Sequence, residues 1–540
     1  MGIRIKHIAF AIILAILCLP ALQRIFHIFP EKGLDGDWAK LPMPEFSDSA
    51  FLAGDFQKVF DPWMEENIGF HNSLVRINNQ LDYSLFLKPN AEGLVRGRNG
   101  QLFEAAYLRA WTGEDFVGEE LLDLKLRQFR FLQKHLKANF DTDLLFILEP
   151  DKASVYPEDV PEGYKKAAEG KSNYDYMRVR AKELGINLID FNAWFQQIKD
   201  TIDYPIFPLQ GTHWSEFAMW YAADSLISYI EAIREIDLPE VVKDSMEYSM
   251  ELRSTDYDEG VTLNLLFELE HGEMPYPAYH FREDSTHTKP NVLAIADSYY
   301  WNIYNTHIPE NLFSKPAFWY FYKKAYPESY HRVTSVKNLN IRAEVEKQDV
   351  ILFGTTARFH HMIDRGFVDD LMGFYGLPQS RNELTRIKTG ILNDLEWFAW
   401  LIEESEKKDI TLAEAIDGHA HHLFMTSRPE TYYGAYGPEP IISNILTNER
   451  WYSNIVKSAA EKGISVEERM MGEARWILGN KHPEALAKYD RVQQIMVNIR
   501  SDEKWYRYVT AKAGRYYMTE EEMLRAEAEY VFSQERKNIE

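Results

Sequence analysis

The segment NVLAIADS, residues 291–298, is an apolar run that ends in two polar residues. Similar runs occur at DLLFILEP (143–150), INLIDF (186–191) and DVILFG (349–354), with helix-like stretches between them. Runs that are apolar on both faces predict strands buried on both sides, and the intervening helices predict a parallel sheet that helices cover. The fold class expected for this part of the chain is therefore α/β.

Functional sites in such sheets lie beyond the carboxyl ends of the strands. A serine in the turn after a strand exposes its hydroxyl and presents its own backbone N–H where an oxyanion forms. Ser298 is thus a candidate nucleophile, although an Asp-Ser pair after a strand also fits a simple helix cap. The same rule selects the other residues at the strand ends, namely Glu149, Asp151, Lys152, Asp190, Asp297 and Gly354.

A second candidate lies in FPLQGTHWSEF, residues 207–217, where His213 stands beside Trp214 just ahead of a helical pattern. An imidazole in that place is suited to act as a general base for a serine. A histidine packed against the tryptophan in the core is the plainer alternative.

Composition excludes several classes of function. The net charge of −23 is spread along the 540 residues, and an acidic surface argues against nucleic acid as a partner. The single cysteine, Cys18, excludes an internal disulfide and a cysteine-based metal site. The group His419, His421 and His422 has no acid or cysteine partner at ligand spacing, so we expect neither a metal nor a cofactor.

The N-terminus carries a targeting pattern. Arg4 and Lys6 precede the uncharged run IAFAIILAILCLPAL, residues 8–22, which is the pattern of a signal anchor or a signal peptide within residues 1–30. We favour an uncleaved anchor because no convincing cleavage site follows; a cleaved peptide and a buried terminal helix are the alternatives. An anchor places the rest of the chain on the extracytoplasmic, periplasmic side of the inner membrane.

The regions ahead of the first predicted strand also carry distinct patterns. Residues 31–55 are rich in Pro and Gly and predict a linker. Apolar spacing predicts helices over 56–87 and 114–138. Between them, EGLVRGRNGQLFE (92–104) predicts a hairpin, because Asn-Gly flanked by short apolar runs is a strong turn signal. The predicted α/β domain spans residues 56–385.

Residues 386–540 predict an all-α region of three helical repeats with a period of 54 residues. Trp397, Trp451 and Trp505 are 54 residues apart. The same register holds for three further columns: Thr411, Ser465 and Thr519; Glu414, Glu468 and Glu522; Ala420, Ala474 and Ala528. Ser or Thr followed three residues later by Glu is a capping box. Each unit is therefore expected to be a helix with the tryptophan, a turn and a capped second helix.

Four segments together resemble a known family over roughly residues 56–375. LDYSLFLKPNAEGLVRGRNGQLF, EPDKASVYPE, GTHWS and IADSYYWN, in this order, are similar to the entry segment, the Asp-Lys strand end, the histidine motif and the nucleophile block of the AlgX/AlgJ-like polysaccharide O-acetyltransferases. The resemblance implies an SGNH-hydrolase-like domain with Ser298 as the nucleophile and His213 as its base. It further implies a polysaccharide acceptor and a multi-pass membrane acyltransferase as the acetyl donor.

The sequence departs from the family pattern at two positions. Ala296 replaces the Gly of the nucleophile block, which is a mild change. Gly211 stands where the family has the triad acid, and an imidazole without its acid loses much of its catalytic power. Three explanations remain open. Another carboxylate acts, with Asp203, Asp190 and Asp151 as candidates; a Ser-His pair works with a backbone carbonyl or water; or catalysis is lost.

The remaining polar residues near the motifs are candidates for the pocket: Asp297, Lys152, Arg358, Trp214 and Tyr299. The run DYDE, residues 256–259, lacks the spaced ligands of a calcium loop and reads as an exposed turn. The leading interpretation is a membrane-anchored O-acetyltransferase. A carbohydrate esterase and a catalytically inactive polysaccharide-binding scaffold are the alternatives.

Overall fold

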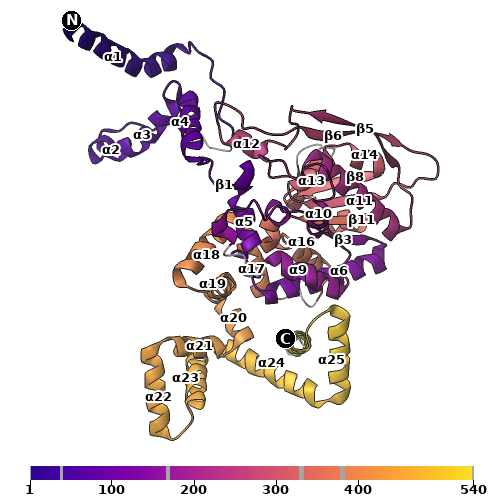
Figure 1. Cartoon of the computed structure of the whole chain (residues 1–540). Coiled ribbons are helices and arrows are strands. Elements are labelled where there is room, and N and C mark those ends of the chain that lie inside the picture. The colour runs from indigo at the N-terminus through magenta and orange to yellow at the C-terminus, as the bar shows by residue number, and fades with distance from the viewer. Residues whose placement is uncertain (1, 37–40, 166–170, 328–333, 378–382, 538–540) are drawn as a thin grey trace.

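The computed structural model describes residues 2–36, 41–165, 171–327, 334–377 and 383–537. A seven-stranded sheet with the order β10-β9-β8-β7-β11-β3-β4 forms its centre (Figure 1). The strands of this sheet are β3 (Asp143–Leu148), β4 (Leu188–Asp190), β7 (Asn291–Ala296), β8 (Lys315–Tyr320), β9 (Lys324–Tyr326), β10 (Thr334–Ser335) and β11 (Val350–Thr355).

The sheet is mixed, whereas the apolar runs predicted a parallel one. Strands β8, β7, β11, β3 and β4 are parallel, and β9 and β10 add an antiparallel edge. All four predicted strands are present within the predicted runs, and their neighbour β8 was missed. Its sequence KPAFWY leads through a tight turn into β9, so the run lacks the polar boundary that marks the other strands.

Both faces of the sheet are buried, as strands in a helix-covered sheet require. Along β3, Leu144, Phe146 and Leu148 point into one core, and Leu145 and Ile147 point into the other. The first core is closed mainly by α6 (Glu119–Phe140), α9 (Asn173–Leu184), α15 (Ile341–Glu346), α16 (Phe367–Phe374) and α17 (Glu383–Leu392). The second is closed by α10 (Phe191–Ile198), α11 (Glu216–Arg234), α13 (Tyr299–Tyr304) and α14 (Ile308–Leu312).

Short elements complete this domain. The predicted hairpin is present as β1 (Leu94–Arg96) and β2 (Leu102–Glu104), which pair antiparallel across a turn with positive φ at Asn99 and Gly100. A second ribbon pairs β5 (Glu240–Ser249) with β6 (Met274–Arg282). The remaining helices are α5 (Ala105–Thr112), α7 (Lys152–Val155), α8 (Glu162–Lys165) and α12 (Asp258–Thr262), with 3-10 turns at η1 (Arg98–Gly100), η3 (Val336–Asn338) and η4 (Ala357–Met362).

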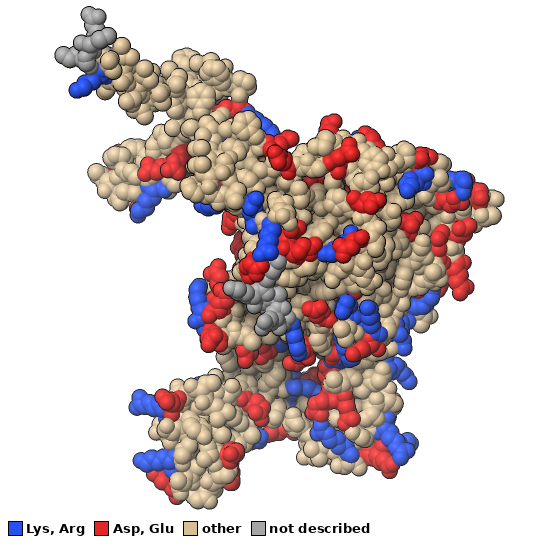
Figure 2. Space-filling model, in the orientation of Figure 1, with Lys and Arg blue, Asp and Glu red and all other residues tan. Residues whose placement is uncertain are grey.

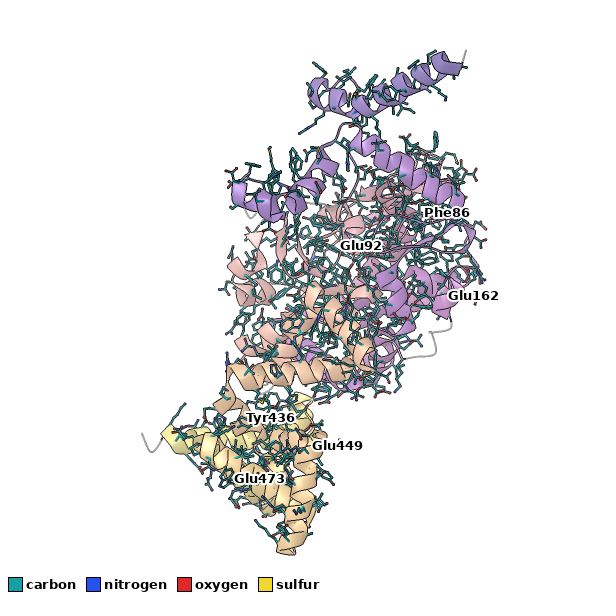
Figure 3. The ribbon with its side chains drawn as sticks, turned by 90° about the vertical axis from the view of Figure 1, so that its left-hand side faces the viewer. Phe86, Glu92, Glu162, Tyr436, Glu449 and Glu473 are labelled. Carbon is teal, nitrogen blue, oxygen red and sulfur yellow. The ribbon has the colours of Figure 1, made fainter. Side chains whose placement is uncertain are left out.

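The N-terminal helices project from the sheet domain (Figures 1 and 3). They are α1 (Gly2–Phe26), α2 (Asp48–Ala53), α3 (Asp55–Asn67) and α4 (His71–Phe86). Within α1, the segment Ile5–Phe26 is long and apolar enough to cross a membrane by length and composition, and it is not buried in the protein. Helix α2 lies inside the segment predicted as a linker, where Ser47 caps it by accepting from the N–H of Ala50.

The C-terminal region is helical, and equivalent caps recur every 54 residues. The helices α18 (Leu395–Lys408), α22 (Glu449–Lys462) and α25 (Glu503–Tyr516) each begin with an Asp or Asn that accepts from the N–H of the repeat tryptophan. The second helices, α19 (Leu412–Ser427), α23 (Val466–Lys481) and α26 (Glu520–Lys537), follow Thr411, Ser465 and Thr519, whose hydroxyls accept from the N–H groups of Glu414, Glu468 and Glu522. The three repeat alanines are fully buried.

The linking helices of this region are α20 (Pro429–Tyr436), α21 (Glu439–Thr447) and α24 (Pro483–Ser501). Figure 3 labels Tyr436, Glu449 and Glu473 in this region, which lies at the opposite end of the molecule from α1. Acidic and basic side chains alternate over the face drawn in Figure 2, in agreement with a net charge that is spread along the chain.

Candidate active site

Ser298 occupies the turn between β7 and α13, at the carboxyl end of a central strand. The preceding residue, Asp297, is fully buried and fixes this turn to the end of the neighbouring strand β11. Its Oδ2 accepts from the backbone N–H of Thr356 at 2.8 Å, from the Thr356 hydroxyl at 3.0 Å and from Arg365 at 3.2 Å. The hydroxyl of Ser298 is thereby held at the edge of the sheet.

Three side chains from separate parts of the chain meet at this edge in a line of hydrogen bonds. The hydroxyl of Ser298 lies 2.9 Å from Nε2 of His213 and is placed to donate to it. On the far side of the ring, Nδ1 of His213 is placed to donate to Oδ2 of Asp258 at 2.5 Å. The side chains of His213 and Asp258 are 14% and 25% exposed, so the site opens to solvent.

Asp258 begins α12, and its second oxygen binds the backbone on both sides of the site. Oδ1 accepts from the N–H of Thr212 and from the N–H of Glu259, both at 2.8 Å. One carboxylate therefore holds the imidazole of His213 and also the peptide that precedes it. Such a carboxylate keeps the proton on Nδ1 and leaves Nε2 free to accept from the serine.

Gly211 fits against the segment that delivers Asp258. A Cβ at position 211 would lie 2.6 Å from Cγ of Pro208 and 2.7 Å from the carbonyl oxygen of Thr255. Contacts that short leave no room for a side chain. The space that the family's acid would need is thus taken by the segment that brings a carboxylate from elsewhere in the chain.

Two buried side chains hold the backbone just ahead of His213. The ammonium of Lys152 donates to the carbonyl oxygens of Pro208, Leu209 and Gly211 at 2.7, 3.0 and 2.8 Å. The hydroxyl of Tyr299 donates to the carbonyl oxygen of Thr212 at 2.6 Å, and its ring packs against the imidazole of His213. The position of the imidazole therefore depends on residues from two strand ends.

The three acids that the sequence suggested for the triad lie elsewhere. Asp151 is fully buried and caps α7, where it accepts from the N–H groups of Ala153 and Ser154. Asp190 caps α10 and accepts from the hydroxyl of Tyr174 at 3.0 Å. Asp203 is exposed. The alternative carboxylate is Asp258, which lies in the run that the sequence had indicated as an exposed turn.

That reading of residues 256–259 was wrong. Asp256 and Glu259 are buried, and burial raises the pKa of each to about 7. The prediction came from the absence of the spaced ligands of a calcium loop, but Asp256 is held inside the fold, where the hydroxyl of Tyr276 donates to its Oδ2 at 2.8 Å. The one signal in the sequence for Asp258 was the group of acids at the start of a short helix. The number of residues between these acids and His213 did not indicate a contact.

Most residues suggested as pocket lining turn out to be structural. Trp214, Tyr299, Asp297 and Lys152 are all at most 3% exposed, because each packs under the site or holds its backbone. Trp214 is surrounded by Phe191, Phe195 and Tyr299. Arg358 is only partly exposed; it is paired with Glu104 and lies over the rings of Tyr107 and Phe359.

The buried carboxyl of Glu149 lies under the nucleophile turn, beside Asp297 and Arg365. Burial and the charge of Asp297 raise the pKa of Glu149 well above its usual value. Burial thus favours the neutral form of Glu149, and the guanidinium of Arg365 lies 3.2 Å from Oδ2 of Asp297. The carboxyl groups of Glu149 and Asp297 and the guanidinium of Arg365 together stabilise the turn that holds Ser298.

The sheet, its helices and the Ser298 turn define an SGNH-hydrolase-like domain. Residues 94–288 match the family described as "SGNH hydrolase-like domain, acetyltransferase AlgX". Over this range the chain is similar to that acetyltransferase family, in agreement with the resemblance seen in the sequence. The matched range contains His213 and Asp258 and ends ten residues before Ser298.

Solved structures similar to this chain include three proteins. The O-acetyltransferase domain of Pseudomonas putida AlgJ is 16% identical with a TM-score of 0.34, covering 50% of this chain and 92% of that one. Pseudomonas aeruginosa AlgX is 14% identical with a TM-score of 0.33, covering 51% and 67%. Bacillus cereus PatB1 is 11% identical with a TM-score of 0.30, covering 49% and 96%. A comparison with curated proteins gave no match.

Proposed function

We propose that the protein is a membrane-anchored, extracytoplasmic O-acetyltransferase that transfers acetyl to hydroxyls of an exported or cell-surface polysaccharide. The observation that carries the proposal is the line of hydrogen bonds from Ser298 through His213 to Asp258. The match of residues 94–288 to the acetyltransferase family supports the type of reaction. Helix α1 supports the anchor.

In the first half-reaction, Oγ of Ser298 attacks the carbonyl carbon of an acetyl ester while Nε2 of His213 takes the hydroxyl proton. Asp258 stabilises the imidazolium that forms. The donor's alcohol leaves with the proton from His213, and acetyl remains on Ser298. In the second half-reaction a sugar hydroxyl attacks the acetyl-serine, gives its proton to His213 and leaves Ser298 free.

The backbone N–H of Ser298 is suited to bind the oxyanion in both steps. It makes no hydrogen bond to any residue within the described ranges. A free donor at the nucleophile lies where the carbonyl oxygen gains charge, and one such bond contributes about 3 kcal/mol to the transition state.

The donor is proposed to be an acetyl group relayed by a multi-pass membrane acyltransferase. This part of the proposal comes from the family resemblance and from α1, which is long and apolar enough to cross a membrane. The acceptor is proposed to be a polysaccharide on the same side.

The test uses the full chain in detergent with p-nitrophenyl acetate, with and without an oligosaccharide acceptor. Acetyl found on the sugar supports transfer, acetate alone supports an esterase, and no turnover supports an inactive scaffold. Ser298→Ala and His213→Ala are expected to abolish the reaction, and intact-mass spectrometry should find one acetyl group on the parent only.

His280 offers a matched control. Its Nδ1 lies 2.8 Å from Oδ1 of Asp244 on the exposed β5-β6 ribbon, so it forms a His-Asp pair away from Ser298. His280→Ala is expected to keep full activity. Unchanged turnover in Ser298→Ala would show that the proposed nucleophile is wrong.

A further inference from the structure

A group of aromatic side chains lies directly beside Ser298. Trp301 follows Ser298 by one helical turn, and the backbone N–H of Trp301 donates to the backbone carbonyl oxygen of Ser298 at 3.1 Å. Its ring centroid lies 5.7 Å from that of Tyr320 and 4.7 Å from that of Tyr326. We call Trp301, Tyr320 and Tyr326 the Trp301 cluster.

The sheet register places the Trp301 cluster at the same edge as the nucleophile. Tyr320 pairs with Ala296, two residues before Ser298, and the N–H of Phe321 donates to the carbonyl oxygen of Ala296 at 2.9 Å. Residues three apart on a helix share a face, so Trp301 and Ser298 lie on one side of the start of α13. His213 approaches Ser298 from the segment ahead of α11, and Asp258 approaches it from the first position of α12.

The polar ends of these rings have no partner among the residues that the structure describes. The indole N–H of Trp301 and the hydroxyls of Tyr320 and Tyr326 make no hydrogen bond there, and all three side chains are half-buried. The indole N–H groups of Trp214 and Trp319 also lack a partner within the described ranges, but both side chains are fully buried in the core, whereas the rings of the Trp301 cluster reach the surface. The Trp301 cluster thus presents ring faces together with free hydrogen-bonding groups.

A sugar ring fits this combination of groups. Its C–H groups form an apolar face that packs on an aromatic ring, and its hydroxyls bind to phenol and indole groups at the ring edges. Two independent features, the location beside Ser298 and the free polar ends, therefore indicate the same kind of ligand.

We propose that the Trp301 cluster is an acceptor subsite, which holds a sugar ring of the polysaccharide so that a neighbouring hydroxyl reaches the acetyl group on Ser298. The inference rests on the proposed function. It adds the location where the acceptor binds and the side chains that select a sugar over water.

Two measurements on the full chain in detergent test the subsite. The first is the partition of acetyl from p-nitrophenyl acetate between water, cellohexaose and glycerol, where glycerol supplies hydroxyls without a ring. The parent is expected to prefer cellohexaose to glycerol at equal hydroxyl concentration. Trp301→Ala is expected to lower that preference about tenfold while ester hydrolysis without a sugar stays near the parent rate.

The second measurement is saturation-transfer NMR of cellohexaose, which reports binding without catalysis. Signals from the sugar C–H groups should appear with the parent and be lost with Trp301→Ala. Tyr320→Phe keeps the ring and removes one hydroxyl, and should weaken transfer less. Trp301→Phe keeps an aromatic ring at this position and tests whether the effect of Trp301→Ala comes from a folding defect. The matched control is Trp476→Ala, which removes a 68% exposed tryptophan of α23.

The outcomes separate the subsite from the reaction. NMR signals that depend on Trp301 without any acetyl transfer would leave the subsite in place and overturn the proposed function. Ester hydrolysis without any preference for cellohexaose would overturn the subsite. So would a preference and NMR signals that Trp301→Ala leaves unchanged. Either result would leave the nucleophile assignment intact.

Discussion

Gly211 and Thr255 are packed so closely that a Cβ on Gly211 would lie 2.7 Å from the Thr255 carbonyl oxygen. This contact explains how the chain keeps a carboxylate on His213 without an acid two residues before it. The segment from Thr255 onward occupies the place of that acid and carries Asp258 to the imidazole.

Gly211→Ala is therefore expected to be destabilising, although it adds one methyl group. The Cβ meets Cγ of Pro208 and the Thr255 carbonyl, so the backbone must move, at a cost of about 1–3 kcal/mol in the free energy of unfolding. Gly390→Ala in α17 is the control, because its Cβ meets nothing within 4 Å. Thermal unfolding of the two variants measures the difference; equal melting temperatures would contradict the packing argument.

Asp258→Asn is expected to reduce kcat for acetyl transfer by about 10²–10⁴-fold with a small effect on folding. One carboxylate oxygen becomes an NH₂ group, which donates to Nδ1 of His213 where the oxygen had accepted from it, so the wrong tautomer becomes populated. Initial rates with p-nitrophenyl acetate measure the loss. Asp203→Asn, at an exposed acid once considered for the same role, should leave the rate unchanged.

Gly211→Asp in the Asp258→Asn background is a second test of the same relationship. The family pattern suggests that an acid at 211 restores activity. The structure predicts no rescue, because the Thr255 segment fills the space. Recovery of the parental rate would mean that this segment moves aside easily.

The apolar runs predicted the strands, and the strand-end rule placed Ser298 at the edge of the sheet. The meeting of Ser298 with His213 was implied by the family resemblance. The sequence also predicted the repeat caps, since a hydroxyl and a glutamate three residues apart act locally. Asp258 escaped prediction because its contact with His213 depends on the path of a segment 45 residues away. The lack of spaced calcium ligands suggested an exposed turn at Asp256 and Glu259, whereas both side chains are buried.

The buried carboxyl of Asp256 predicts a pH effect on stability. Burial raises its pKa to about 7, above the value of about 3.9 in an unfolded chain. The folded state therefore holds the proton between these values while the unfolded state has released it. The stabilisation is complete below about pH 4 and is lost as the pH rises through about 7. The melting temperature should fall between pH 5 and pH 8 for this reason.

Asp256→Asn cannot ionise, so its melting temperature is expected to fall less between pH 5 and pH 8 than that of the parent. Asp244→Asn replaces a half-exposed aspartate of β5 and should follow the parent curve. Differential scanning calorimetry at four pH values measures both. A parallel fall in parent and Asp256→Asn would show that Asp256 does not hold a proton in the folded state.

The contact between α6 and α26 carries the last prediction. The guanidinium of Arg127 donates to both carboxylate oxygens of Glu522, at 2.9 and 3.0 Å, and to the carbonyl oxygen of Tyr517 at 2.7 Å. The carboxylate of Glu522 also accepts from the N–H of Thr519, so one side chain both caps α26 and fastens it to the sheet domain.

Arg127→Gln should lower the free energy of unfolding by about 2 kcal/mol. The loss is smaller than for a fully buried pair because Glu522 is partly exposed. Hydrogen exchange should quicken in α25 and α26 and stay unchanged in the strands. Arg507→Gln, which breaks an exposed pair with Glu503 in the same region, should leave exchange unaltered. Equal exchange in the two variants would mean that the third repeat is held to the sheet domain by apolar contacts such as Phe131 on Tyr516.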